Sequence, residues 1–418
     1  LLMQDENLKD IVESLEPKIL ILGREFENSS DPNIVDSIKL QISNKREIEF
    51  HGGEINYVNS DLLHNSKSEL QEIRKRDFLD KCNKEAITKG TILEAIKFWK
   101  NSHLLVIGDT IVDQYAACEP LGISAEAPVV VVKELEKKNF IGGAAIVAKH
   151  ISALGSKCTF LSVTGKDSLA NYVQSDLINS GINSNLIEDQ TRPTTLKKRY
   201  LVDNQKLFRV SKLEEHKLNK EIENKIIKKL RFYASKIDGI VVSDFVYGVI
   251  TKKILDEIQF LSRKYSIMLF GDIQCSSQVG DITTLKNFSL ICPNEKESRI
   301  ALKDNETGLE KLSQVLIKKT HSKRLIMKLG SDGFIAYDFS KKIFKSQSFP
   351  ALSVNPLDVA GAGDSLLAVM SVGLSCKQNM MTTSAIACCM AAIAVETMGN
   401  IPISKDKLVS KIINVFDK

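Results

Sequence analysis

The stretch Asp358-Val-Ala-Gly-Ala-Gly-Asp364-Ser-Leu-Leu-Ala368 is a glycine-rich turn that opens directly into an apolar helix. Gly361 and Gly363 let the backbone bend and approach a ligand closely, because they carry no Cβ. The first N–H groups of a helix have no partner within it, and the helix dipole favours negative charge there. The pattern therefore predicts an anion pocket that suits a phosphate group.

Asp364 falls in the first turn of the expected helix, next to that pocket. A carboxylate at this place can take the proton from an attacking hydroxyl, which is the task of the base in phosphoryl transfer. The simpler alternative is an ordinary helix start followed by a core helix, because short glycine-rich turns recur by chance. The rest of the chain has to decide between the two.

Composition excludes several classes of protein. With 418 residues, 43% hydrophobic and 26% charged, the chain is typical of a globular protein larger than one ordinary core. The net charge of +5 is spread along the chain and aromatic residues are few, so nothing favours a nucleic-acid partner. No apolar run approaches the ~18 residues of a membrane-spanning helix, and no signal-peptide pattern is present. We expect a cytoplasmic protein without a membrane partner.

The eight cysteines include no Cys-x-x-Cys pair, which predicts free, buried thiols in a reducing cytoplasm rather than disulfides or zinc ligands. The six histidines show no metal-ligand spacing. Neither a Walker A sequence nor Gly-x-Gly-x-x-Gly occurs, so no motif favours a P-loop NTPase or a Rossmann dehydrogenase.

The chain divides into three parts by its hydrophobic pattern. Residues 1–66 predict a small α/β piece: a helix over 8–15, a buried strand over 18–22, a second helix, a strand over 47–50, and a last helix capped at Ser60-Asp61. Residues 67–100 are rich in Lys, Glu and Arg and predict a helical connector whose charges form a solvated face. Residues 101–418 form the main domain.

In the main domain, short apolar runs alternate with amphipathic helices, which predicts a mainly parallel sheet covered on both faces. Five of the runs end in Asp, Asn or Gly, namely at Asp109, Asp244, Asp272, Asn294 and Gly330. Such residues commonly begin loops, so one alone means little. Because ligands bind beyond the carboxyl ends of parallel strands, the set predicts one shared cleft.

Two segments break the alternation: residues 127–133, and the pair 194–202 and 207–210, which have no helix between them. We expect them to form a small antiparallel sheet over the cleft, a lid that excludes water.

Several motifs together resemble those of the ribokinase-like (PfkB) carbohydrate kinases over about residues 103–405. The closest likeness is to the heptose-7-phosphate kinase domain of bifunctional heptose kinase/nucleotidyltransferases. The motifs are Gly108-Asp109-x-x-x-Asp113-x-Tyr115, Ile123-Ser-x-Glu126-Ala-Pro-Val129, Gly142-Gly-Ala-Ala145, Asn204-Gln205 with Arg209, Ser243-Asp244-x-x-x-Gly248, Pro293-Asn294-x-x-Glu297 and the 358–364 stretch. The resemblance implies a three-layer α/β/α sandwich with a small β lid.

Residues 1–66 resemble the C-terminal half of a cytidylyltransferase-like nucleotidyltransferase, through Ile19-Leu-Ile-Leu-Gly23, Glu49-Phe-His-Gly-Gly-Glu54-Ile and Ser60-Asp61-Leu-Leu63. The catalytic His-x-Gly-His of that family is absent from the chain. We therefore do not expect nucleotidyl transfer from this piece.

The kinase resemblance implies phosphorylation of a sugar or sugar-phosphate hydroxyl, with ATP and Mg²⁺ as cofactors. Asp364 would be the base, and the N–H groups of Ala360 to Gly363, including Gly361 and Ala362, the anion hole. The implied nucleotide side is Asn294, Glu297, Lys328, Gly330, Gly333 and Asp358, with Glu297 positioning Mg²⁺ through water. The implied sugar side is Asp109, Asp113, Gly142, Gly143, Asp244, Lys197, Arg199 and Arg209, the last three as cations suited to a sugar phosphate. Some relatives dimerise through the lid, so a homodimer is an expectation here too.

For some of these candidate site residues, a purely structural interpretation remains open. The three cations fit ordinary charges at a strand edge, and Gly142-Gly143 fits a helix start. Asn294 and Glu297, three residues apart, fit a capping interaction.

Three positions depart from the family pattern. Ile146 stands where an Asn is common, Tyr247 where heptose kinases tend to have Lys, and Gln274 where they favour the Lys of Asp-Pro-Lys. These losses put the identity of the sugar in doubt, while the base and its turn are intact. We expect a kinase with a drifted substrate. The rival hypothesis is a catalytically weak sugar- or nucleotide-binding scaffold attached to a nucleotidyltransferase.

Overall fold

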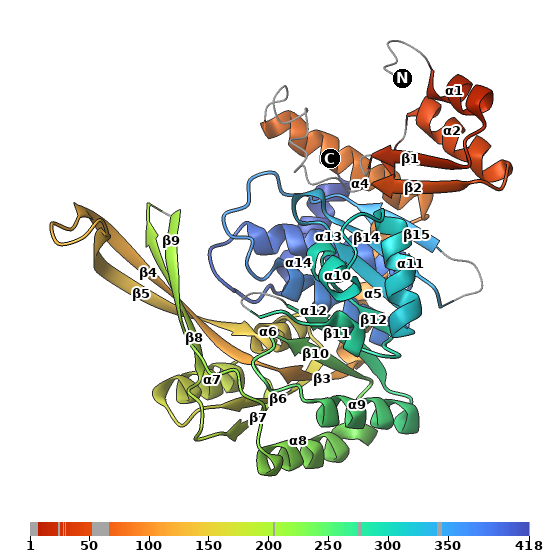
Figure 1. Ribbon diagram of the computed structural model, residues 1–418. Helices are drawn as coiled ribbons and strands as arrows, with labels where there is room; N and C mark the ends of the chain where they lie inside the picture. The colour runs from red at the N-terminus through yellow and green to blue at the C-terminus, as the bar shows by residue number, and fades with distance from the viewer. Residues whose placement is uncertain are drawn as a thin grey trace.

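A computed structural model of the protein describes residues 7–23, 26–27, 29, 31–51, 67–203, 205–274, 278–340 and 345–417. The expected helix capped at Ser60-Asp61, the residues from Gly52 to Leu63 quoted for the nucleotidyltransferase likeness, and Asn204 of the lid motif lie outside these ranges. The described chain forms a helix-covered central sheet, a projecting lid and a small N-terminal unit (Figure 1).

The central sheet has nine strands in the order β15-β14-β13-β12-β11-β10-β3-β6-β7. Every pair from β13 to β7 is parallel, and only β14 and β15 run antiparallel to their neighbours, so the expected mainly parallel sheet is confirmed. The strands are β3 (His103–Gly108), β6 (Lys157–Thr164), β7 (Asn183–Glu188), β10 (Gly239–Asp244), β11 (Met268–Ile273), β12 (Leu290–Ile291), β13 (Arg324–Lys328), β14 (Phe334–Asp338) and β15 (Lys345–Phe349).

Alternate residues of each strand face opposite cores, because successive side chains in a strand point to opposite sides. In β3, Leu104 and Val106 belong to one cluster of buried residues, and Leu105 and Ile107 belong to the other. The first cluster includes residues of α4 (Lys67–Lys84), α5 (Lys89–Lys97), α6 (Ala144–Ala153), α7 (Ser168–Asn179), α12 (Ala362–Ser375), α13 (Met380–Val395) and α14 (Lys405–Phe416). The second includes residues of α8 (Lys220–Tyr233), α9 (Lys252–Tyr265) and α11 (Leu309–Thr320). The molecule is therefore an α/β/α sandwich.

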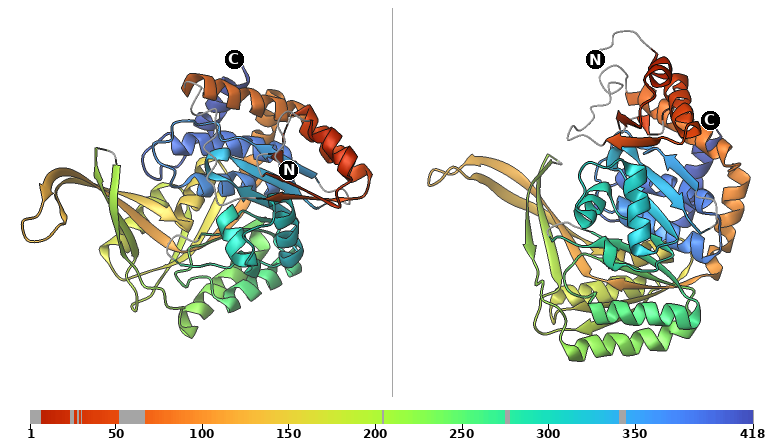
Figure 2. Two further views of the ribbon diagram at one scale, coloured as in Figure 1. Left: turned by 45° about the horizontal axis from the view of Figure 1, so that its top comes forward. Right: turned by 45° about the vertical axis from the view of Figure 1, so that its right-hand side comes forward.

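The lid is a four-stranded sheet that projects from the body (Figure 2). Its strands are β4 (Thr110–Ile123), β5 (Val130–Gly143), β8 (Thr195–Val202) and β9 (Gln205–Lys212), in the order β5-β4-β8-β9. The expected antiparallel pairing of 194–202 with 207–210 is confirmed by β8 and β9, but the lid as a whole is a mixed sheet, because β4 and β8 pair in parallel. These two strands run in the same direction because each follows a parallel strand of the main sheet, β3 and β7, and leaves from the same edge.

The N-terminal unit has the expected order of helix, strand, helix, strand: α1 (Leu8–Leu15), β1 (Ile19–Gly23), α2 (Pro32–Ser43) and β2 (Glu47–His51). The prediction of a buried strand was wrong for half of β1, since Ile19 and Ile21 are 47% and 61% exposed. The residues that pack together, including Val12, Leu20 and Leu22, lie on one side of the two-stranded parallel sheet. The unit meets α11 through an ion pair of 2.5 Å between Glu49 and Lys311.

The helices of residues 67–100 pack into the body rather than only leading to it. Phe78, Ile92 and Trp99 are fully buried in the same cluster as β3. Arg74 is not part of a solvated face as expected, because its guanidinium donates to the carbonyls of Ala351 at 3.1 Å and Ser353 at 2.9 Å.

The seven cysteines in the described residues are free, and six of them are buried. Among the described helices, none is both long and apolar enough to cross a membrane.

Candidate active site

The five strand ends singled out in the sequence lie side by side. Strands β13, β12, β11, β10 and β3 are neighbours in that order and all run in parallel, so their carboxyl ends share one edge of the sheet. Asp109, Asp244, Asp272, Asn294 and Gly330 stand at or just beyond these ends. The helix α12, which follows the glycine-rich turn, packs against β11 and β10 at this edge.

The turn before α12 has the form that an anion pocket needs. Gly361 is the N-cap residue with φ of +83°, and no side chain of the described residues caps the helix there. By contrast, α13 is capped by the side chain of Asn379. A Cβ on Gly361 would lie 2.4 Å from Oδ1 of Asn400, so glycine is required by space as well as by φ. The N–H of Ala360 donates to Asp358, so the first backbone N–H group that a ligand could bind is that of Gly361.

Asp364 lies in the first turn of α12 and is 5% exposed. Its Oδ1 accepts a hydrogen bond of 2.7 Å from Nε2 of Gln274. Burial, and then the negative charge of Asp272, raise the pKa of Asp364 to about 7, against the opposing effects of Lys328 and Gln274. A carboxyl group that loses its proton near neutral pH suits a general base.

A buried ion pair flanks this carboxylate. Nζ of Lys328 lies 2.7 Å from Oδ2 of Asp272, and it would lie 3.4 Å from a Cβ on Gly363, which places the ammonium beside the first turn of α12. Burial raises the pKa of Asp272 to about 6 even though Lys328 opposes it. The expected nucleotide residues Gly330 and Gly333 follow in the chain with φ of +62° and +91°. The structure thus brings Lys328 together with the glycine-rich turn at the start of α12.

Asn294 and Glu297 form the capping interaction that the sequence left open. Oδ1 of Asn294 accepts from the N–H of Glu297, and Oε2 of Glu297 accepts from the N–H of Asn294, each at 2.7 Å, at the start of α10 (Glu295–Leu302). No group of three or more His, Cys, Asp or Glu side chains in the described residues can hold a metal. Within the described residues, Oδ1 of Asp272 is buried without a hydrogen-bond partner, and Glu297 is near enough to raise the pKa of Asp272. The carboxylate oxygens of Asp272 and Glu297 therefore fit a magnesium ion that is held mainly by water and nucleotide phosphates.

On the expected sugar side, Asp113 is held from two directions. Its Oδ1 forms an ion pair with Arg199 of β8, and its Oδ2 accepts from Nδ2 of Asn400 at 2.8 Å. A Cβ on Gly142 would lie 2.2 Å from Oδ2 of Asp113, so this glycine lets the backbone approach the carboxylate. Arg209 is directly opposite Arg199 in the β8–β9 pairing, which puts both side chains on one face of the lid.

Asp109 and Asp244 form an acid pair that holds a loop. Oδ2 of Asp109 accepts from the N–H of Phe245 at 2.8 Å, and Oδ1 of Asp244 accepts from the N–H of Val246 at 2.8 Å. Each carboxyl affects the pKa of the other: burial and then the charge of Asp109 raise the pKa of Asp244 well above its usual range. Val246 has φ of +64°, a strained conformation for a β-branched residue. The pair fixes the 245–249 loop instead of pointing freely at a ligand.

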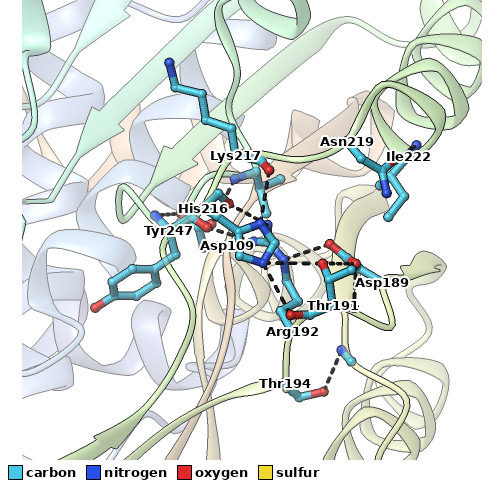
Figure 3. A network of polar contacts seen from close by, with 12 residues as sticks. Asp109, Asp189, Thr191, Arg192, Thr194, His216, Lys217, Asn219, Ile222 and Tyr247 are labelled. Atoms are coloured by element: carbon cyan, nitrogen blue, oxygen red, sulfur yellow. Dashed lines mark hydrogen bonds and ion pairs between the residues drawn. The ribbon is translucent and has the colours of Figure 1, made fainter.

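Arg192 also holds this loop, through the backbone carbonyl of Tyr247 (Figure 3). Its buried guanidinium donates to the carbonyls of Tyr247 at 2.8 Å and His216 at 2.6 Å, and to Oδ2 of Asp189 at 2.9 Å. The ring of Tyr247 forms a cation–π contact with Lys197, whose Nζ lies 5.2 Å from the ring centroid. Sequence reasoning missed Arg192, since its partners are distant in the chain except for Asp189.

Lys197 is buried and lies over a second aromatic ring as well, with Nζ 5.0 Å from the ring centroid of Phe245. Two of the departures from the family pattern thus have a place in the structure: Tyr247 forms part of an aromatic platform for Lys197, and Gln274 is a partner of Asp364. The third, Ile146, is fully buried in α6.

Asp358, expected on the nucleotide side, faces the lid. Its carboxylate accepts hydrogen bonds from the hydroxyl of Tyr115 at 2.6 Å and from Nζ of Lys206 at 2.7 Å. Gly143, expected on the sugar side, is the N-cap residue of α6 with φ of +62°.

Similarity to known proteins identifies the class of enzyme to which this fold belongs. Residues 101–407 match the pfkB family carbohydrate kinases, and the protein belongs to that family. Among solved structures, phosphofructokinase-2 from Escherichia coli superimposes with a TM-score of 0.62 at 17% identity, over 76% of this chain and 100% of that one. Ribokinase from Thermotoga maritima gives 0.57 at 20% identity, over 74% and 99%. These likenesses confirm the ribokinase-like fold.

Curated relatives carry a more particular name. The bifunctional protein HldE of Helicobacter acinonychis is 32% identical over 304 residues, which are 71% of this chain and 63% of that protein. The bifunctional protein HldE of Desulfatibacillum aliphaticivorans is 27% identical over 318 residues, or 75% and 63%. The chain therefore spans less than two thirds of the length of these relatives.

Proposed function

We propose that this carbohydrate kinase transfers the γ-phosphoryl group of ATP to a hydroxyl of a phosphorylated sugar, with heptose 7-phosphate and its 1-hydroxyl as the first candidate. The observation that carries the proposal is the buried carboxylate of Asp364, with a pKa raised to about 7, in the first turn of a helix without a side-chain cap. PfkB kinases use ATP, and the likeness to HldE proteins supports a heptose phosphate.

The chemistry follows from the residues of the turn. Above its pKa, the carboxylate of Asp364 takes the proton of the sugar hydroxyl while that oxygen bonds to the γ-phosphorus and the bond to the ADP oxygen breaks. The N–H groups of Gly361, Ala362 and Gly363 donate hydrogen bonds to the phosphoryl oxygens and stabilise the negative charge that develops on them. The Lys328 ammonium, beside Gly363, adds positive charge at the same place. Mg²⁺ on the nucleotide, held through water by Glu297 with Asp272, would neutralise further phosphate charge.

The lid cations support a substrate that already carries a phosphate. Arg199 and Arg209 share one lid face, and Lys197 lies at the base of the lid. A phosphate monoester binds such cations through charge-assisted hydrogen bonds, each worth about 1.5–3 kcal/mol. We therefore expect kcat/KM for a sugar phosphate to exceed that of the same sugar without phosphate by at least roughly tenfold.

ATP consumption across heptose 7-phosphate, fructose 6-phosphate and their unphosphorylated counterparts tests the proposal, with the position of the new phosphate read by phosphorus NMR. Arg209→Met is the matched variant, because it removes one exposed lid cation and leaves the base and turn in place. It is expected to lower kcat/KM for the phosphorylated sugars alone. Binding of these sugars without any ATP consumption would instead favour the scaffold hypothesis.

Further parts of the proposal concern the other regions. We propose that residues 1–66 are a partial nucleotidyltransferase-like unit, that 67–100 connect it to the kinase, and that 101–418 are the kinase domain. The helix-strand order of the N-terminal unit supports the first point. A homodimer through the lid is supported by the exposed apolar side chains of Ile123, Val130 and Phe208. Sedimentation of the protein and of an Ile123→Lys variant tests the dimer, which the added charge is expected to weaken.

A further inference from the structure

Asp358 joins the glycine-rich turn to the lid. Its side chain is fully buried, at 0% exposure, whereas that of Lys206 is 40% exposed. The oxygen Oδ1 accepts from Lys206 of β9, and Oδ2 accepts from the hydroxyl of Tyr115 of β4. Lys206 also lies over the Tyr115 ring, with Nζ 5.9 Å from its centroid. Side chains from two strands of the lid therefore contact one carboxylate at the start of the glycine-rich turn.

The same carboxylate holds backbone on the body side. Its Oδ1 also accepts from the N–H of Ala360 at 3.0 Å, and its Oδ2 from the N–H of Gly399 at 3.3 Å. Ala360 directly precedes Gly361, the N-cap residue of α12. The position of Asp358 therefore sets the path of the backbone into the anion pocket. The loop at Gly399 leads to Asn400, which contacts Asp113 on the sugar side.

A buried carboxylate stays ionised only if cations or hydrogen bonds compensate for the lost water. Burial alone raises the pKa of Asp358, but the hydrogen bonds from Lys206, Tyr115 and the N–H of Ala360 outweigh it, so the pKa lies below its usual value. Lys206 is the one of these three partners that carries a positive charge and stands on the outer strand β9 of the lid. If the lid moves away, this charge leaves and Asp358 loses most of its compensation.

We propose that Lys206 and Asp358 form a positioning pair through which lid closure orders the phosphate pocket. With the lid closed, the pair fixes Asp358 and thereby the backbone from Ala360 to Gly361; with the lid open, that backbone loosens. Neither side chain touches the reacting atoms in this account. The inference rests on the proposed function only in taking the turn as the seat of the phosphoryl group.

Backbone hydrogen exchange of the full chain without ligands tests the pair directly. Lys206→Met removes the ammonium and keeps the length of the side chain, and Lys206→Arg restores a cation. Lys212→Met is the matched control, since Lys212 is an exposed lysine at the other end of the same strand. We expect exchange in the 358–363 segment to be faster by about threefold or more in Lys206→Met, and near wild type in the other two. Unchanged exchange in that segment would overturn the proposal.

Nucleotide affinity gives a second readout that a merely structural lysine would not change. The dissociation constant of a non-hydrolysable ATP analogue is measured with and without saturating fructose 6-phosphate or heptose 7-phosphate, whichever binds. We expect the sugar to tighten nucleotide binding in the wild type. We expect Lys206→Met to lose at least about threefold of that effect, in addition to the weaker sugar-free affinity that follows from the loosened 358–363 segment. If Lys212→Met loses this tightening of nucleotide binding equally, or if Lys206→Met loses none of it, the proposed positioning role of Lys206 and Asp358 is contradicted. Both readouts are independent of turnover, so a failure of Asp364 as the base remains distinguishable.

Discussion

The side-chain amide of Gln274, just after β11, donates a hydrogen bond of 2.7 Å to the carboxylate of Asp364 in the first turn of α12. Heptose kinases favour a lysine at this place, so the glutamine put the identity of the sugar in doubt. In the structure, Gln274 contacts Asp364, the proposed base, directly. Gln274 is therefore placed to tune the proton affinity of Asp364.

The pH dependence of turnover tests this contact. Because Asp364 acts in its ionised form and its pKa is raised to about 7, wild-type turnover is expected to rise as pH increases through neutrality. Gln274→Met removes a donor to the ionised carboxylate, so the rise moves to higher pH. Gln274→Lys adds a positive charge, so the rise moves to lower pH. Measurement of kcat from about pH 5.5 to 9 checks the order of the three curves. Coincident curves would show that the contact has no effect on the base.

The acid pair of Asp109 and Asp244 predicts unequal effects of two similar substitutions. Burial and the charge of Asp109 raise the pKa of Asp244 and so favour its protonated form. Asp244→Asn supplies an equivalent donor and acceptor and is expected to change the free energy of unfolding by less than about 1 kcal/mol. Asp109 accepts from the N–H groups of Phe245, Tyr247 and Val249, so Asp109→Asn turns an amide donor toward them. It is expected to cost roughly 2–4 kcal/mol. Urea unfolding of both variants measures the difference, and equal costs would contradict the assignment of the protonated form to Asp244.

The buried pair of Lys328 and Asp272 predicts a loss of both stability and nucleotide binding. Lys328→Met leaves the charge of Asp272 without its cation, and breaking such a pair costs roughly 3–5 kcal/mol. Adding Asp272→Asn to the variant removes the orphaned charge and is expected to recover part of the stability. Binding of the ATP analogue stays weak in both, because the ammonium beside Gly363 is gone. Calorimetry separates these effects, and recovery of nucleotide binding in the double variant would remove Lys328 from the phosphate site.

The sequence predicted the main sheet well because its strands are buried on both faces and read as continuous apolar runs, as in β3 and β10. It failed for β4, which was not expected as a strand. The outer half of β4 is mostly exposed and contains Pro120 and Gly122, so its composition resembles a loop. Pairing with β5, the next strand in the chain, and with the distant strand β8 keeps it extended.

The candidate site shows the same division between local and distant information. The glycine-rich turn and Asp364 lie in one short stretch, so the position of Asp364 in the first turn of a helix could be predicted. Lys206, Asn400 and Arg192 could not, because each acquires its role from partners more than 20 residues away, such as Asp358 for Lys206 and Asp113 for Asn400. Polar residues that act through tertiary contacts leave no periodic signal in the sequence.

The most direct test of the account is turnover by Asp364→Asn, with Asp256→Asn as a control on the exposed face of α9. We expect kcat to fall by roughly 10²–10⁴ in Asp364→Asn alone, with the affinity for the ATP analogue within about threefold of wild type. Because the folded-state pKa of Asp364 is raised, the stability that its protonated form gives is lost as pH rises toward about 7. The asparagine variant is therefore expected to be the more stable protein at alkaline pH, which excludes unfolding as the cause. Turnover within tenfold of wild type would contradict the assignment of Asp364 as the base.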